Sequence, residues 1–281
     1  MSTSTHLEVT TIHPSAPTPH THTIIFLHGR FIRALHNWYS TPGQTLFTAL
    51  PTFRFVFPQA PLRPVASTAD DFRQQVWPQW FDVWTPRDFS EREELQAEGL
   101  REMVPLARDL VRAEAERLGG RWDRVVLAGI SMGAATSVHT LFNLDVPAAG
   151  GGRLGALMAF CARCPFAGRG LGGMREVLGL EGVPRDDGVV RRTPVLLENN
   201  ADDPLVLVEK GRGLRDILRE FGAQVEWKEY PRGMHWFKED EGLDDVVEFL
   251  TRVVDGVRRV VVATPGGQSQ AAGEGEAMDL S

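Results

Sequence analysis

The chain has 281 residues, of which 42% are apolar and 24% are charged, and its formal net charge is −7. This apolar fraction excludes a disordered protein, and no apolar run approaches the roughly 20 residues that a membrane-spanning helix needs. The acidic balance argues against a nucleic-acid partner, and two cysteines are too few for a disulfide framework.

The N-terminal residues 1–20 are rich in Ser, Thr, Pro and His and predict a flexible arm. They lack the basic and then apolar pattern of a signal peptide, which favours a cytoplasmic protein. Residues 263–281 are small and polar and predict a disordered tail. Residues 21–262 contain no linker and no repeat, so we expect them to form a single domain.

Within this domain, short β-branched or aromatic runs alternate with longer helical patterns. The runs predict strands at Thr23–Leu27, Phe53–Phe57, Arg124–Ala128, Leu154–Phe160, Pro194–Leu197 and Val225–Tyr230. Amphipathic spacing predicts helices at 91–118, with a kink or break at Pro105, and at 243–254. Nearly continuous apolar strands that alternate with helices indicate an α/β fold with a doubly wound, mostly parallel sheet.

Between the third of these strands and a helix of small residues stands Gly129-Ile-Ser131-Met132-Gly133. A serine flanked by glycines at a strand-to-helix junction is typical of a nucleophile elbow, in which a sharp turn holds the hydroxyl above the sheet. A chance match to this loose pattern is the alternative. The strand before it and the helix after it favour Ser131 as a nucleophile.

An activated serine needs a base, and in α/β-hydrolases the acid and then the histidine follow the serine in the chain. Two histidines follow Ser131. His139 lies within the helix after the elbow, where we expect packing or exposure to solvent. His235 lies in the loop after the last predicted strand and is the better candidate for the base.

The candidate acid lies in the turn after Pro194–Leu197, which contains Asp202 and Asp203. Asp203, directly before Pro204, is the preferred choice and Asp202 is the alternative. The second oxyanion donor is predicted after the first strand, in His28-Gly29-Arg30. There Gly29 permits the backbone to approach the site closely, and the N–H of Arg30 can act with that of Met132 as an oxyanion donor. His28 is expected to have a structural role.

Together these motifs resemble the acyl-protein thioesterase, or phospholipase/carboxylesterase, family of α/β-hydrolases over roughly residues 23 to 252. FPQAPLRPV at 57–65 is similar to its P-H-A-P-x-R-P-V/I segment, and WPQWFD at 77–82 to its M-P-S-W-F-D segment. GISMGA at 129–134 resembles its G-F-S-Q-G-G elbow, and DPLV at 203–206 its acid loop. The resemblance implies an α/β-hydrolase fold.

It also implies a triad of Ser131, Asp203 and His235, an oxyanion hole from the backbones of Arg30 and Met132, and no cofactor or metal. Trp80, Phe81 and Trp236 are candidates for contacting substrate, with core packing as the alternative reading of Trp80 and Phe81. Cys161 and Cys164 lack further ligands at zinc spacing and are expected to pack near the pocket wall.

The chain departs from the family at the oxyanion loop, where residues 30–34 (RFIRA) replace the usual H-G-L-G-D continuation. We therefore expect a serine hydrolase that cleaves carboxylic esters or thioesters of small molecules or acylated proteins. An esterase for small or secondary-metabolite esters is one alternative. A catalytically silent α/β-hydrolase that binds a ligand or a partner is another.

Overall fold

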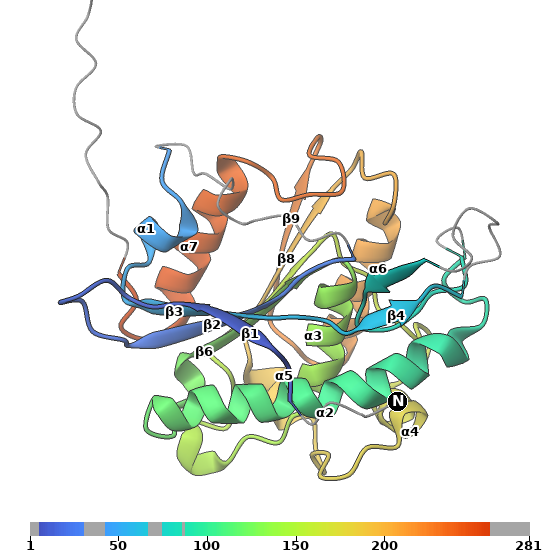
Figure 1. Ribbon diagram of the computed structural model, residues 1–281, viewed down its shortest axis with the longest axis horizontal. Coiled ribbons are helices and arrows are strands. Elements are labelled where there is room, and N and C mark those ends of the chain that lie inside the picture. Colours follow the sequence, from blue (N-terminus) through green and yellow to red (C-terminus); the bar gives the residue numbers. More distant parts are fainter. Residues whose placement is uncertain (1–5, 31–42, 67–74, 86–87, 259–281) are drawn as a thin grey trace, which may run out of the picture.

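The computed structural model describes residues 6–30, 43–66, 75–85 and 88–258 (Figure 1). A seven-stranded sheet runs through its centre in the order β1-β3-β2-β6-β7-β8-β9. Every neighbouring pair from β3 to β9 is parallel, and β1 is antiparallel to β3. The strands are β1 Val9–Ile12, β2 His22–Leu27, β3 Phe53–Pro58, β6 Val125–Ile130, β7 Ala156–Phe160, β8 Val195–Asn200 and β9 Val225–Tyr230.

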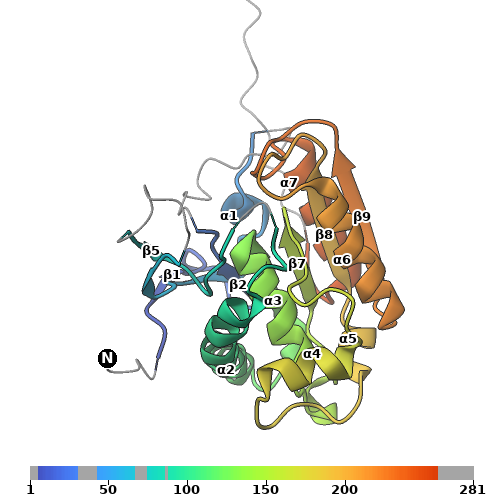
Figure 2. The ribbon, with the colours of Figure 1, turned by 90° about the vertical axis from the view of Figure 1, so that its right-hand side faces the viewer.

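Helices cover both faces of this sheet, and a separate two-stranded ribbon pairs β4 with β5 (Figures 1 and 2). The ribbon consists of β4 Leu62–Pro64 and β5 Val76–Pro78. The α-helices are α1 Leu46–Ala49, α2 Glu93–Arg117, α3 Met132–Phe142, α4 Leu171–Leu178, α5 Gly188–Arg192, α6 Val208–Glu220 and α7 Glu241–Val253. Two single 3₁₀ turns are η3 Trp122–Arg124 and η4 Ala148–Gly150.

The core consists of two apolar layers, one on each face. Alternate residues of β2 divide between them: Ile25 and Leu27 pack with α2, α3, α4 and α6, whereas Ile24 and Phe26 pack with α1 and α7. This division follows from the two-residue period of a strand. The prediction of a mostly parallel, doubly wound sheet in one domain is confirmed. The central strands are buried on both faces, and this is why their sequences are nearly continuous apolar runs.

Two expectations fail in detail. Residues 9–12 were expected in the flexible arm but form the edge strand β1, whose residues are exposed or half-buried and therefore show little apolar pattern. Helix α2 continues through Pro105 over 25 residues, so the break that was predicted there as an alternative to a kink does not occur. Its buried side extends on both sides of the proline, from Leu100 to Val111, so packing against the sheet offsets the lost hydrogen bond.

The ends of the chain, 1–5 and 259–281, lie outside the described residues, and with them the predicted tail and the start of the predicted arm. No helix in the described part is both long and apolar enough to cross a membrane.

Candidate active site

Ser131 occupies the turn between β6 and α3, at the carboxyl edge of the sheet. Its backbone has φ 57° and ψ −119°, a conformation that a non-glycine residue rarely adopts. The two flanking residues must be glycines because other backbone atoms approach them too closely to admit a Cβ. A Cβ on Gly133 would lie 2.1 Å from the carbonyl oxygen of Leu27, and one on Gly129 would lie 2.5 Å from the carbonyl carbon of Gly133. The elbow predicted from the sequence is therefore present in the fold.

The two residues predicted to supply oxyanion N–H groups, Met132 and Arg30, are close to Ser131 in the chain or in the fold. Met132 is the first residue of α3, where N–H groups have no partner within the helix. Arg30 follows Gly29, and a Cβ on Gly29 would lie 3.3 Å from the Cβ of Ser131, so the end of β2 passes directly beside the nucleophile. The N–H of Ser131 itself donates to the carbonyl of Phe160, which fixes the elbow to the end of β7.

Asp203 and His235 form a direct contact at the same edge. The Oδ2 of Asp203 lies 2.7 Å from the Nδ1 of His235, and its Oδ1 accepts hydrogen bonds from the N–H groups of Leu205 and Val206. The Asp203 side chain is 1% exposed and that of His235 is 17% exposed. Because a carboxylate only accepts, the proton of neutral His235 lies on Nδ1, and Nε2 keeps its lone pair.

The loop that bears His235 is held by two residues from the end of β8. Asp202 Oδ1 accepts hydrogen bonds from the N–H groups of Gly233 and Met234. Asn200 Nδ2 donates to the carbonyls of Met234 and Trp236, one on each side of His235. The sequence offered Asp202 as the alternative acid, but its contacts place it on the loop backbone. The role of Asn200 was not predicted from the sequence, although its position at the end of a strand could have indicated it.

The two other histidines near the site have structural contacts. His28 Nε2 accepts from the N–H of Ala60, which leaves Nδ1 to donate to the carbonyl of Gly29. Burial lowers the pKa of His28. His139 is fully buried, contacts the Pro165 carbonyl at 3.3 Å, and its pKa is lowered to about 4, chiefly by burial. Both therefore remain neutral at neutral pH: His28 has structural contacts, as expected, and His139 is packed, which was one of the two alternatives given for it.

The expected substrate contacts of Trp80 and Phe81 are not supported, because both side chains are 0% exposed. Trp80 Nε1 donates to the carbonyl of His28, and Phe81 packs against α2, where a Cβ on Gly99 would lie 2.4 Å from its Cα. Trp80 thus holds the backbone that follows β2, and Phe81 is part of the packing against α2. Trp236 is half-buried, and substrate contact by this residue remains a prediction.

Cys161 lies beside the acid and the base. Its Sγ, a carboxylate oxygen of Asp203 and a ring nitrogen of His235 lie within 4.8 Å of one another, a set of donors that a thiophilic metal could use. The thiol donates to the Trp236 carbonyl at 3.3 Å, and burial raises its pKa well above the ordinary value. Cys164 is also buried, and its pKa is raised to about 12. Both thiols are therefore protonated packing groups at neutral pH.

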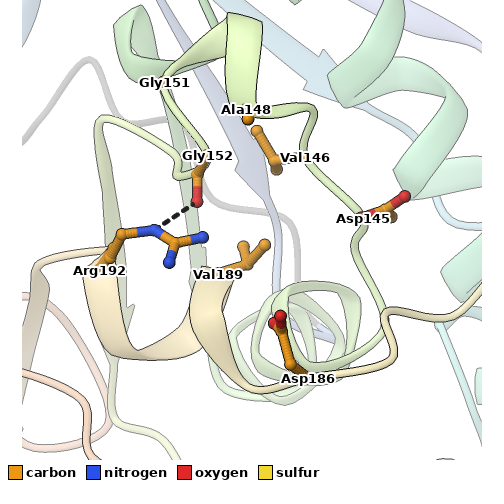
Figure 3. A pocket seen from close by; sticks show the side chains of 8 residues that line it. All are labelled: Asp145, Val146, Ala148, Gly151, Gly152, Asp186, Val189 and Arg192. Atoms are coloured by element: carbon orange, nitrogen blue, oxygen red, sulfur yellow. Dashed lines mark hydrogen bonds between the residues drawn. The ribbon is translucent and has the colours of Figure 1, made fainter.

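A pocket of about 370 Å³ lies at the opposite end of the sheet (Figure 3). Its lining comes from residues 145–152, which precede β7, and 186–192, which precede β8. Arg192 crosses it and donates to the Gly152 carbonyl at 3.1 Å. Since Ser131 follows β6 at the carboxyl edge, this pocket is not part of the candidate active site.

A parallel, doubly wound sheet with a strained serine elbow defines an α/β-hydrolase. Solved structures share this fold: Zea mays acyl-protein thioesterase 2 has a TM-score of 0.63 and 24% identity, and the match covers 89% of this chain and 100% of that one. Arabidopsis thaliana SOBER1 has a TM-score of 0.63 and 23% identity, with 83% and 99% covered.

Sequence comparisons identify the group more narrowly. Acyl-protein thioesterase 1 of Gibberella zeae is 28% identical over 246 residues, which cover 84% of this chain and 92% of that protein. The Neurospora crassa protein of the same name is 28% identical, with 83% and 86% covered. The phospholipase/carboxylesterase family profile matches residues 9–169. The chain belongs to this family, whose named relatives are hydrolases of ester bonds.

Proposed function

We propose that this protein is a serine esterase or thioesterase that works through an acyl-enzyme. In the first step, Ser131 Oγ attacks the carbonyl carbon of the substrate while His235 Nε2 takes the hydroxyl proton. The negative charge that develops on the carbonyl oxygen is held by the N–H groups of Arg30 and Met132. The leaving alcohol or thiol then takes the proton from His235.

In the second step, water attacks the acyl group on Ser131 with His235 again as the base, and the carboxylic acid is released. Asp203 orients the imidazole and stabilises its positive form. The observation that carries the proposal is the 2.7 Å contact between Asp203 and His235 at the sheet edge that bears Ser131. This buried acid–base pair also argues against the catalytically silent alternative.

Ser131 Oγ and His235 are not hydrogen-bonded to each other in the described part of the chain. The proposal requires that this contact form when substrate binds, as catalytic hydrogen bonds in unliganded enzymes often do. The acyl-protein thioesterase names of the relatives support a thioester or ester of an acylated protein or small molecule as the substrate class.

The experiment is covalent labelling with a fluorophosphonate, followed by assays on a chain-length series of nitrophenyl esters and on an S-palmitoyl peptide. We expect labelling of the wild type and of Ser137→Ala, a serine in the next helix, and none of Ser131→Ala. Equal labelling of Ser131→Ala would refute the proposal. Cleavage of short nitrophenyl esters without cleavage of the peptide would remove the acyl-protein substrate and leave the small-ester alternative.

A further inference from the structure

Arg30, which directly follows Gly29 at the proposed nucleophile, carries a largely buried positive charge. The side chain of Arg30 is 20% exposed, and its Nε and Nη2 are buried without a hydrogen-bond acceptor among the described residues. The nearest carboxylate among those residues is Asp82, with Oδ1 at 3.6 Å from Nη2, beyond hydrogen-bond distance. Both oxygens of Asp82 already accept backbone N–H groups, from Ala66 and Val83.

A second arginine follows β7 at the same edge of the sheet. Arg163 is 6% exposed and donates from Nη2 to the neutral amide oxygen of Gln96 at 2.7 Å. Its guanidinium lies 3.8 Å from the ring centroid of Phe89, and no carboxylate in the described residues forms an ion pair with it. Burial lowers the pKa of Arg163 to about 9; the negative charge of Glu93 opposes this shift, and the positive charge of Arg30 adds to it.

The two guanidinium groups contact one segment, which consists of β5 and its connection to α2. Arg30 lies over the ring of Trp77, 5.3 Å from its centroid, and Arg163 lies 5.7 Å from that of Phe81. Gly29, directly before Arg30, is beside Ser131, and Arg163 is two residues from Cys161, whose Sγ lies within 4.8 Å of donor atoms of Asp203 and His235. Both arginines therefore follow strand ends at the edge of the sheet that bears Ser131.

Burying a cation without a well-placed anion is unfavourable, and the penalty is relieved when a ligand supplies the negative charge. Guanidinium groups suit a carboxylate because their planar N–H pairs match its two oxygens. An apolar acyl chain, by contrast, would leave Nε and Nη2 of Arg30 without a hydrogen-bond acceptor among the described residues and Arg163 bonded to a neutral amide.

We propose, on the basis of the function given above, that the site selects esters bearing a carboxylate on their acyl or alcohol part, held by Arg30 and Arg163. Cleavage itself is unchanged: water and the ester give an acid and an alcohol through acyl-Ser131. The arginines act by orienting substrate, so their contribution is expected mainly in KM and in the choice between charged and neutral esters.

The experiment compares kcat/KM for matched pairs of substrates. On the acyl side, mono-nitrophenyl glutarate is paired with its methyl ester, and on the alcohol side 4-acetoxybenzoate is paired with methyl 4-acetoxybenzoate. We expect the carboxylate member of one pair to be preferred about tenfold or more, since a charged hydrogen bond contributes roughly 1.5–3 kcal/mol. The pair that shows the preference identifies the part of the ester that binds the arginines.

Arg30→Met and Arg163→Met should each lower that ratio about tenfold, whereas Arg212→Met, on the exposed side of α6, should not change it. The ratio is insensitive to partial misfolding because both esters meet the same enzyme. Equal or better cleavage of both neutral esters by the wild type, or an unchanged ratio in both arginine variants, would overturn this inference alone. Absence of Ser131-dependent cleavage of any of the esters would instead overturn the proposed function.

Discussion

Asp202 and Asp203 are adjacent in the chain, yet they hold different parts of the same loop. Asp203 contacts the His235 imidazole and is buried, whereas Asp202 is exposed and accepts N–H groups from Gly233 and Met234. The first contact bears on the protonation pattern of the base, and the second bears only on the position of the backbone. An amide in place of each carboxylate therefore separates the two roles.

We predict that Asp203→Asn lowers kcat on nitrophenyl esters by about three orders of magnitude or more. The amide can donate to Nδ1, which would put the imidazole proton on Nε2 and remove the lone pair that Ser131 needs. Asp202→Asn keeps an oxygen that accepts both N–H groups and should retain activity within about threefold. Steady-state kinetics of the two variants, with thermal melts as a check on folding, test the assignment. Loss of activity in Asp202→Asn alone would reverse it.

At the scale of elements, the elbow depends on the contact between β2 and the start of α3. Gly133 permits that contact because it has no side chain to meet the Leu27 carbonyl. Gly213 of α6, by contrast, is exposed, and a Cβ there would meet no atom within 4 Å. Replacing glycine by alanine is therefore expected to destabilise the protein at position 133 and to stabilise it at position 213.

Gly133→Ala should lower the free energy of unfolding by about 2 kcal/mol or more, because backbone must move to admit the methyl group. It should also reduce esterase activity, since the shift displaces Ser131. Gly213→Ala should raise the free energy of unfolding by roughly 0.5–1 kcal/mol through helix propensity and leave activity unchanged. Urea unfolding of both variants measures the difference. Equal stability of the two would show that the elbow is not tightly packed.

The central parallel strands, the elbow and the positions of Asp203 and His235 could be predicted from the sequence because each has a local pattern. β1 could not, because its short edge strand is stabilised by pairing with β3 and not by its own apolar residues. The break expected at Pro105 did not occur because tertiary packing of α2 outweighs a local preference. The burial of Trp80 and the contacts of Asn200 depend on segments far away in the chain, which no local pattern records.

For the whole molecule, buried His139 makes stability depend on pH. Its pKa is about 4 in the folded chain and about 6.5 when unfolded, so the unfolded state binds the extra proton between these values. This contribution to stability is complete above pH 6.5 and is lost as the pH falls toward 4. Between pH 7 and pH 5 the loss amounts to about 2 kcal/mol.

We therefore predict that His139→Gln flattens the fall in the free energy of unfolding between pH 7 and pH 5, whatever its effect at pH 7. Urea titrations at several pH values, on wild type and variant, measure the two slopes. Parallel slopes would mean that His139 is protonated or exposed in the folded protein.

The central claim, that Ser131 carries the acyl group, is tested most directly by intact-protein mass spectrometry of enzyme quenched during turnover of a nitrophenyl ester. The account predicts a species heavier by one acyl group, mapped by peptide digestion to Ser131, together with a burst of nitrophenol that matches the enzyme concentration. Ester hydrolysis by the wild type with the acyl group on another residue, or hydrolysis at the same rate by Ser131→Ala, would contradict it.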